Sequence, residues 1–146
     1  MMHIGILNCF KPADEATVSE NEATRFQRFL GQASDQLTFT EYRVTEGERP
    51  ASPAVCDAYL ITGSPQGVYD DEPWIEPLQQ FICEVYAAQQ KMVGICFGHQ
   101  VLAHALGGET VKAADKGWGL GLREFEIVEK RPWMNPPLEK GALYFA

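Results

Sequence analysis

Basic residues and long apolar segments are both scarce in this sequence, and each absence excludes a class of function. The 146 residues include 12 Lys and Arg against 20 Asp and Glu, a formal net charge of -8. A protein that binds nucleic acid or an anionic membrane without specificity needs an excess of positive charge. No stretch approaches the roughly 18 apolar residues of a membrane span. We therefore expect neither a nucleic-acid partner nor a membrane partner.

Cysteine is present, but it lacks the spacing of a metal site. The four cysteines are Cys9, Cys56, Cys83 and Cys96, and no two of them form a C-x-x-C pair. Scattered cysteines in a chain of this length are typical of reduced thiols inside the cell. The N-terminus also lacks the basic segment and cleavage site of a secretory signal. We expect a cytoplasmic protein with no metal site and no cofactor.

Histidine is scarce as well, which limits the choice of a catalytic base. The sequence has His3, His99 and His104, and none of them begins a His-x-Glu segment. His3 opens the first predicted strand, so it lies at the amino end of the sheet. His99 and His104 follow Cys96 on one predicted helix, and His104 is far enough along it to be a packed or surface residue. His99 is the nearest candidate base, although its helical position recedes from the cysteine.

Apolar runs and helical patterns alternate along the chain. Strands are predicted at residues 3–8, 37–44, 58–61 and 92–95, and helices at 21–33, 72–90 and beyond 98. This alternation is typical of a parallel sheet with helices on both faces, in which ligands bind beyond the carboxyl ends of the strands. Later strands are predicted at 109–112, 122–128 and 141–146, with a glycine-rich turn at 116–121 and a proline-rich loop at 131–137. The length fits one domain over residues 1–146.

The stretch around Cys96 has the pattern of a nucleophile. Cys96 stands where a buried strand is expected to turn sharply into a helix, with Gly94 and Gly98 on either side. These glycines let the strand and the helix approach closely, as in the nucleophile elbow of Gly-x-Ser-x-Gly enzymes. A helix N-terminus also favours the thiolate form of a cysteine. The alternative is a packing role, because free cysteine is among the most buried residue types.

A second segment is expected to reach the same edge of the sheet. The glycine-containing loop at residues 62–67 follows the strand at 58–61, so it lies at a strand carboxyl end like Cys96. The N–H of Phe97, and that of Gly63 or Ser64, are candidate donors to an oxyanion. Taken alone, the loop is more typical of an ordinary turn or a weak phosphate-binding loop than of a catalytic site.

Together these residues resemble a known family. Residues 94–100, Gly-Ile-Cys-Phe-Gly-His-Gln, closely resemble the nucleophile signature of class I glutamine amidotransferases. Residues 60–65, Leu-Ile-Thr-Gly-Ser-Pro, resemble the oxyanion loop of that family. Residues 116–121, Lys-Gly-Trp-Gly-Leu-Gly, resemble its stand-alone, GMP-synthase-like members. The resemblance implies a flavodoxin-like α/β fold for the whole chain.

The resemblance also implies a reaction. Cys96 would attack the side-chain amide of glutamine, giving a γ-glutamyl thioester and ammonia for an acceptor on a synthase domain or partner. The N–H groups of Phe97 and of Ser64 or Gly63 would hold the oxyanion, and Gln100 would help to bind the substrate. The family requires no cofactor for this step.

The sequence departs from the family pattern in two ways. Ser64 stands where the family commonly has a second glycine, and the catalytic His-x-Glu segment is absent. We therefore expect the domain to be incomplete at its C-terminus, with the last strand cut off.

Two alternatives remain beside the amidotransferase. One is a γ-glutamyl hydrolase-type cysteine peptidase, and the other is a catalytically silent domain that binds glutamine or regulates a synthase. Phe97 argues against the related intracellular proteases and chaperones, which carry His directly after the nucleophile.

Overall fold

The computed structural model describes residues 1–113, 117, 119–135 and 139–145. The chain divides into two compact units, residues 1–112 and residues 113–146. The expectation of one domain over the whole length stays a prediction. Within the described residues, no helix combines the length and the apolar character needed to cross a membrane.

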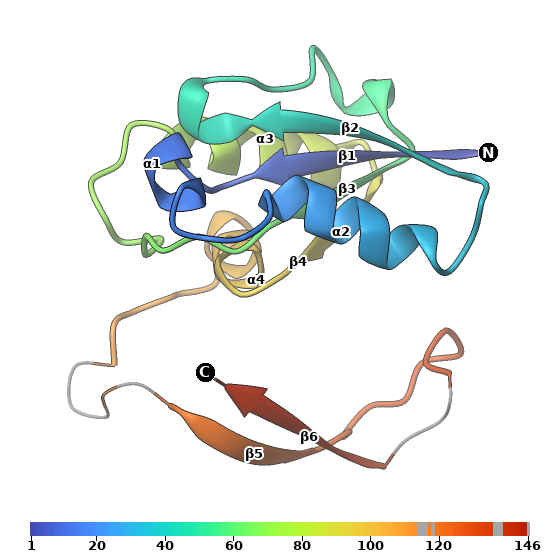
Figure 1. Ribbon diagram of the computed structural model, residues 1–146, viewed down its shortest axis with the longest axis vertical. Helices are drawn as coiled ribbons and strands as arrows, with labels where there is room; N and C mark the ends of the chain where they lie inside the picture. Colours follow the sequence, from blue (N-terminus) through green and yellow to red (C-terminus); the bar gives the residue numbers. More distant parts are fainter. Residues whose placement is uncertain (114–116, 118, 136–138, 146) are drawn as a thin grey trace. The chain divides into compact units, whose positions relative to one another are not determined.

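Four strands form the sheet of the first unit, in the order β2-β1-β3-β4 (Figure 1). Their bounds are Met2–Asn8 for β1, Leu37–Arg43 for β2, Ala58–Ile61 for β3 and Lys91–Gly94 for β4. Each neighbouring pair is parallel, with Ile6 beside Leu60 and Ile61 beside Gly94. The predicted parallel sheet is confirmed.

Helices cover both faces of this sheet (Figure 1). The helices are α1 (Pro12–Glu15), α2 (Glu22–Gly31), α3 (Ile75–Ala87) and α4 (Phe97–Ala105), with the 3-10 turns η1 (Val44–Glu46) and η2 (Pro53–Val55). Ile6 and Leu60 form one core cluster with residues of α2, whereas Leu7 and Ile61 belong to a second cluster with α3 and α4. Successive strand residues point to opposite faces, so the short apolar runs supply both cores.

Two predictions about the first unit need correction. The helix expected at 72–90 begins at Ile75, so Pro77 lies in its first turn, where a missing N–H costs no helical hydrogen bond. The strand expected at 109–112 is wrong, because that segment is irregular. The Thr110 hydroxyl instead donates to the carbonyl of Gln100 at 3.2 Å. A strand needs a neighbouring strand for its backbone groups, and none of the described strands pairs with this segment.

The expectation that Cys96 follows a buried strand is also wrong for the described chain. β4 lies at one end of the strand order, and the side chain of Val93 is 55% exposed. The periodicity of an apolar run does not tell an edge strand from a central one.

The second unit contains an antiparallel pair, β5 (Gly121–Glu126) and β6 (Lys140–Phe145). The ring of Phe125 packs over Gly141, where a Cβ atom would overlap it. The strands predicted at 122–128 and 141–146 are thus confirmed with small shifts. Parts of the predicted turn and loop, Lys116, Trp118, Pro136 and Pro137, lie outside the described residues, as does Ala146.

Candidate functional site

The backbone at Cys96 has the geometry of a nucleophile elbow. Its φ is 55° and its ψ is -111°, a conformation that residues with a Cβ atom rarely adopt. Such strain costs on the order of 1–3 kcal/mol and is found most often at functional sites. A Cβ atom on Gly94 would overlap the backbone of Gly98, and one on Gly98 would overlap the carbonyl of Ile61. The two glycines therefore allow the turn, and the predicted strand-to-helix junction at Cys96 is confirmed.

The loop after β3 lies directly beside this elbow. The N–H of Ile95 donates to the carbonyl of Ile61 at 3.0 Å, which extends the pairing of β3 and β4 to the point where Cys96 begins its turn. A Cβ atom built on Gly63 would lie 3.6 Å from the Cβ of Cys96. The expectation that both strand ends meet at one edge of the sheet is confirmed.

Three backbone N–H groups at this edge have no acceptor within the described part of the chain. None of the described residues accepts a hydrogen bond from the N–H of Gly63, Ser64 or Phe97. The Phe97 N–H is free because the first turn of a helix has no intrahelical acceptors. The buried Phe97 ring packs against that of Trp74, with centroids 5.3 Å apart, which fixes the start of α4. These are the donors that the sequence predicts for an oxyanion.

Gln100, the predicted substrate-binding residue, lies one turn along α4. Its N–H donates to the carbonyl of Cys96 at 3.1 Å, and its side chain is half-buried. Its role in substrate binding stays a prediction.

The three histidines do not converge on Cys96. His3 lies at the amino end of β1, where its Nε2 is 2.9 Å from the Thr40 hydroxyl, at the opposite end of the sheet. His104 is packed on α4, and its buried Nδ1 has no partner among the described residues. His99 is exposed near the start of α4. His99 stays the nearest candidate base, and whether it serves as one stays untested.

The cysteines differ sharply in their surroundings. Cys9 is fully buried, and burial raises the pKa of its thiol to about 12. Burial also raises the pKa of Cys56 above its ordinary value. Cys83 and Cys96 are exposed. The described residues contain no group of three or more metal-ligating side chains.

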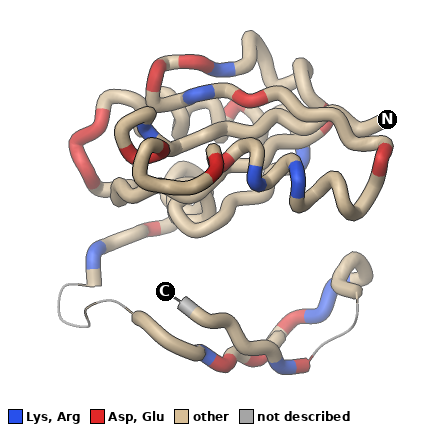
Figure 2. Tube along the Cα trace, viewed as in Figure 1, with Lys and Arg blue, Asp and Glu red and all other residues tan. Residues whose placement is uncertain are grey.

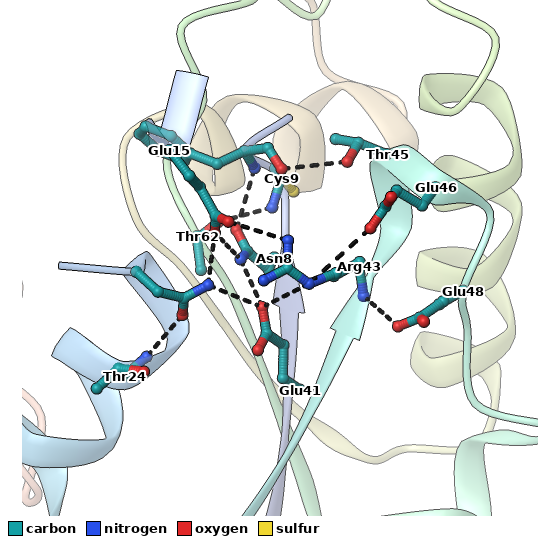
Figure 3. Close-up of polar contacts among 12 residues, drawn as sticks. Asn8, Cys9, Glu15, Thr24, Glu41, Arg43, Thr45, Glu46, Glu48 and Thr62 are labelled. Atoms are coloured by element: carbon teal, nitrogen blue, oxygen red, sulfur yellow. Dashed lines mark hydrogen bonds and ion pairs between the residues drawn. The ribbon is translucent and has the colours of Figure 1, made fainter. Parts of the chain in front are cut away.

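A polar network lies at the carboxyl ends of β1 and β2 (Figure 3). The amide of the fully buried Asn8 donates to carboxylates of Glu15 and Glu41, each at 2.7 Å. Arg43 donates to the second oxygen of Glu15 at 2.9 Å, and this hydrogen bond is the main cause of a raised pKa of Arg43. The network fixes α1, which carries Glu15, against the sheet.

The loops at this edge are predominantly acidic (Figure 2). The connection between β3 and α3 contains three consecutive acidic residues, Asp70, Asp71 and Glu72. Lys11 forms an ion pair with Glu72 at 2.7 Å. An acidic edge repels polyanions such as a nucleic-acid backbone.

A cavity of about 240 Å³ lies between η1 and the first turns of α3. It is lined mainly by apolar residues, among them Val44, Trp74 and Phe81, with Arg49 at its polar part. None of the predicted site residues lines it.

Sequence reasoning gave no individual role to Thr62 and Gln66 of the loop after β3, or to Asp14, which contacts Gln66. Thr62 is fully buried, and its hydroxyl contacts the loop backbone. The only signal in the sequence was a threonine directly after an apolar run. The contact between Gln66 and Asp14 joins residues 52 positions apart, which no local pattern indicates.

The sequence and the fold are both similar to those of known proteins. Residues 28–129 match the family model of class-I glutamine amidotransferases. The chain is 34% identical over 107 residues to gamma-glutamyl peptidase 4 of Arabidopsis thaliana, covering 72% of this chain and 41% of that protein. It is 28% identical over 141 residues to a glutamine amidotransferase-like protein of Schizosaccharomyces pombe, covering 87% and 56%.

A solved glutamine amidotransferase of Methylobacillus flagellatus gives a TM-score of 0.65 at 26% identity, over 84% of this chain and 45% of that one. The chain thus spans about half the length of these three relatives, between 41% and 56%. The predicted flavodoxin-like fold is confirmed by this likeness. The family model covers well over half of the sequence, and the chain belongs to the class-I glutamine amidotransferase family.

Proposed function

We propose that the chain forms the nucleophile half of a glutamine-hydrolysing site, with Cys96 as the nucleophile. The observation that carries the proposal is the strained elbow at Cys96, beside three backbone N–H groups that have no described acceptor. Such an arrangement suits an acyl transfer in which negative charge develops on a carbonyl oxygen.

In the proposed reaction, the Cys96 thiolate adds to the γ-carbonyl carbon of glutamine. The carbonyl oxygen takes the negative charge and accepts hydrogen bonds from the N–H groups of Phe97 and of Ser64 or Gly63. The C–N bond then breaks, and the nitrogen takes a proton and leaves as ammonia. Water adds to the γ-glutamyl thioester, the C–S bond breaks, and glutamate and the Cys96 thiol are released.

The base and the acceptor belong to the proposal as well. The family resemblance assigns the base to a His-x-Glu segment, and this sequence has none. We therefore expect catalytic turnover to depend on a histidine and an acid supplied by further polypeptide, and the ammonia to pass to an acceptor such as a synthase partner. We expect the protein to work in the cytoplasm.

A second candidate is γ-glutamyl peptidase activity. It is favoured by the 34% identity to gamma-glutamyl peptidase 4. The same thiol would then attack the γ-amide bond of a γ-glutamyl peptide, and an amino acid or peptide amine would leave in place of ammonia.

A chloroketone analogue of glutamine tests the proposal, because its alkylation of a thiolate does not require the missing base. The sulfur displaces chloride, and intact-mass and peptide mapping locate the adduct. We expect one adduct, on Cys96, which excess glutamine prevents. Cys83→Ala is the matched control because it removes the other exposed cysteine, and it should label like the parent chain.

The remaining outcomes separate the candidates. Protection by a γ-glutamyl dipeptide but not by glutamine would favour the peptidase. A folded chain in which Cys96 is not labelled would refute both enzymatic readings and leave a silent binding domain.

A further inference from the structure

The loop that lies beside Cys96 is held by side chains on both sides of one peptide bond. This bond joins Gly63 to Ser64, and its two ends carry the carbonyl of Gly63 and the N–H of Ser64. In a trans peptide the carbonyl and the N–H point in opposite directions. A contact that holds the carbonyl therefore also fixes where the N–H points.

The first contact comes from Thr62. Its hydroxyl donates to the carbonyl of Gly63 at 2.9 Å and accepts a hydrogen bond from the N–H of Cys9 at 2.9 Å. Thr62 is fully buried, and its own N–H donates to the carbonyl of Leu7 at 3.1 Å. The carbonyl of Gly63 is thus tied to β1, and the N–H of Ser64 is directed away from the Thr62 hydroxyl.

The second contact comes from Gln66. The Ser64 hydroxyl donates to the side-chain carbonyl of Gln66 at 2.8 Å and accepts from the Gln66 N–H at 3.2 Å. The amide of Gln66 in turn donates to Asp14 at 3.3 Å. Pro65, between Ser64 and Gln66, further restricts the backbone of Ser64.

Asp14 is itself well placed to act as an anchor. It lies on α1, and the next residue, Glu15, accepts hydrogen bonds from Asn8 and Asn21 at 2.7 and 2.6 Å and from Arg43 at 2.9 Å (Figure 3). A series of contacts therefore runs from a partly buried network at the end of the sheet to the loop beside Cys96.

We infer that Thr62, Gln66 and Asp14 are positioning residues that clamp the Gly63–Ser64 peptide with the N–H of Ser64 available to an oxyanion. The inference rests on the proposed function, because it assigns these residues to the same reaction. It also gives Ser64 a role. Where glycine would leave the loop free to rotate, the serine hydroxyl attaches it to Gln66, so the donors are held in place before substrate arrives.

Two thiol reagents that differ in their need for the oxyanion donors test this clamp, formed by Thr62, Gln66 and Asp14, in the full chain. The glutamine chloroketone places a carbonyl oxygen at the donors, whereas iodoacetamide requires only an accessible thiolate. We expect Thr62→Val and Gln66→Ala to slow labelling of Cys96 by the chloroketone about tenfold or more, in line with the loss of an oxyanion donor. Labelling by iodoacetamide should change less than about twofold.

Conservative and remote variants provide the controls. Thr62→Ser keeps the hydroxyl and Asp14→Asn keeps an acceptor for Gln66, so both should label at the parent rate, whereas Asp14→Ala should resemble Gln66→Ala. Thr38→Val and Gln80→Ala make the same chemical changes at exposed positions of β2 and α3, and should alter neither rate.

The outcomes separate the clamp from the reaction on which it rests. Equal slowing by both reagents, or parent-like chloroketone rates in Thr62→Val and Gln66→Ala, would overturn the clamp while leaving Cys96 as nucleophile. Gln66→Ala and Asp14→Ala change partly exposed side chains, so the test holds even if Thr62→Val fails to fold. Absence of glutamine-protected labelling in the parent chain would instead refute the proposed function.

Discussion

The surroundings of each cysteine decide which thiol can react. Cys9 and Cys56 belong to the hydrophobic core, and burial disfavours their thiolate forms. Cys96 instead lies exposed at the start of a helix, in a backbone conformation that the surrounding glycines permit. Cys83 is exposed as well, but only Cys96 combines exposure with the nucleophile motif and the strained backbone of the elbow.

The buried thiol of Cys9 should make stability depend on alkaline pH. In the unfolded chain this thiol ionises near its ordinary pKa of 9.0, whereas in the folded chain it stays protonated up to a pKa of about 12. Between these values the unfolded state binds fewer protons, so the free energy of unfolding falls as pH rises. Below pH 9 the Cys9 thiol is protonated in both states, so its stabilising contribution to the free energy of unfolding is fully present. The expected slope from this one group is about 1.4 kcal/mol per pH unit.

Chemical denaturation of the parent chain and of Cys9→Ala at pH 8, 9, 10 and 11 measures that slope. The raised pKa of Tyr59 affects both proteins alike, so their difference isolates Cys9. The difference in free energy of unfolding between the parent chain and Cys9→Ala should shrink above pH 9. A difference that stays constant up to pH 11 would contradict the protected thiol.

The position of most candidate site residues could be predicted from the sequence, but the contacts of the proposed clamp could not. Cys96, Phe97 and the Gly63–Ser64 loop come together because two parallel neighbouring strands end at one edge, which follows from the alternation of strands and helices. The role of Thr62 depends on the N–H of Cys9, a residue 53 positions away. Side-chain contacts of this kind depend on tertiary packing rather than on local spacing.

At the scale of elements, the close packing of α4 against β3 determines the elbow. Gly98 lies in α4 against the carbonyl of Ile61 in β3, and a Cβ atom there would overlap backbone that has no room to move. We expect Gly98→Ala to lower the free energy of unfolding by about 1–3 kcal/mol. The shift of α4 should also reduce chloroketone labelling of Cys96. Denaturant titration and labelling rates measure the two effects.

Gly31→Ala is the matched control, since a Cβ atom on Gly31 in α2 would meet no atom within 4 Å. This change should be neutral or stabilise by up to about 1 kcal/mol, because alanine loses less backbone freedom on folding. If both variants behave alike, close packing at Gly98 does not hold the elbow.

The elements themselves were predicted with uneven success, for physical reasons. Apolar periodicity located every strand of the parallel sheet, because burial on one or both faces requires it. It failed at residues 109–112, where the apolar pattern pairs with none of the strands that the structure describes. It also failed to identify β4 as an edge strand of the described sheet. The exposure of a strand depends on which strands lie beside it, and the sequence of one segment does not show this.

At the scale of the molecule, stability should reside in the first unit. Both core clusters consist entirely of residues between Ile4 and Ala105. In the second unit, by contrast, Leu122, Leu143 and Tyr144 are all more than half exposed. A lone two-stranded hairpin is at best marginally stable in water. The unit of residues 1–112 should therefore fold cooperatively by itself.

Chemical denaturation of a chain shortened to residues 1–112 tests this expectation against the whole protein. Its free energy of unfolding should agree with that of the whole chain within about 0.5 kcal/mol, the agreement usual for independent parts. A peptide of residues 113–146 should show no cooperative transition. Because the elbow and the loop at residues 62–67 both lie in the first unit, the shortened chain should also keep glutamine-protected labelling of Cys96. Loss of its cooperative transition would mean that the hairpin stabilises the core, and loss of labelling alone would place part of the glutamine site in the second unit.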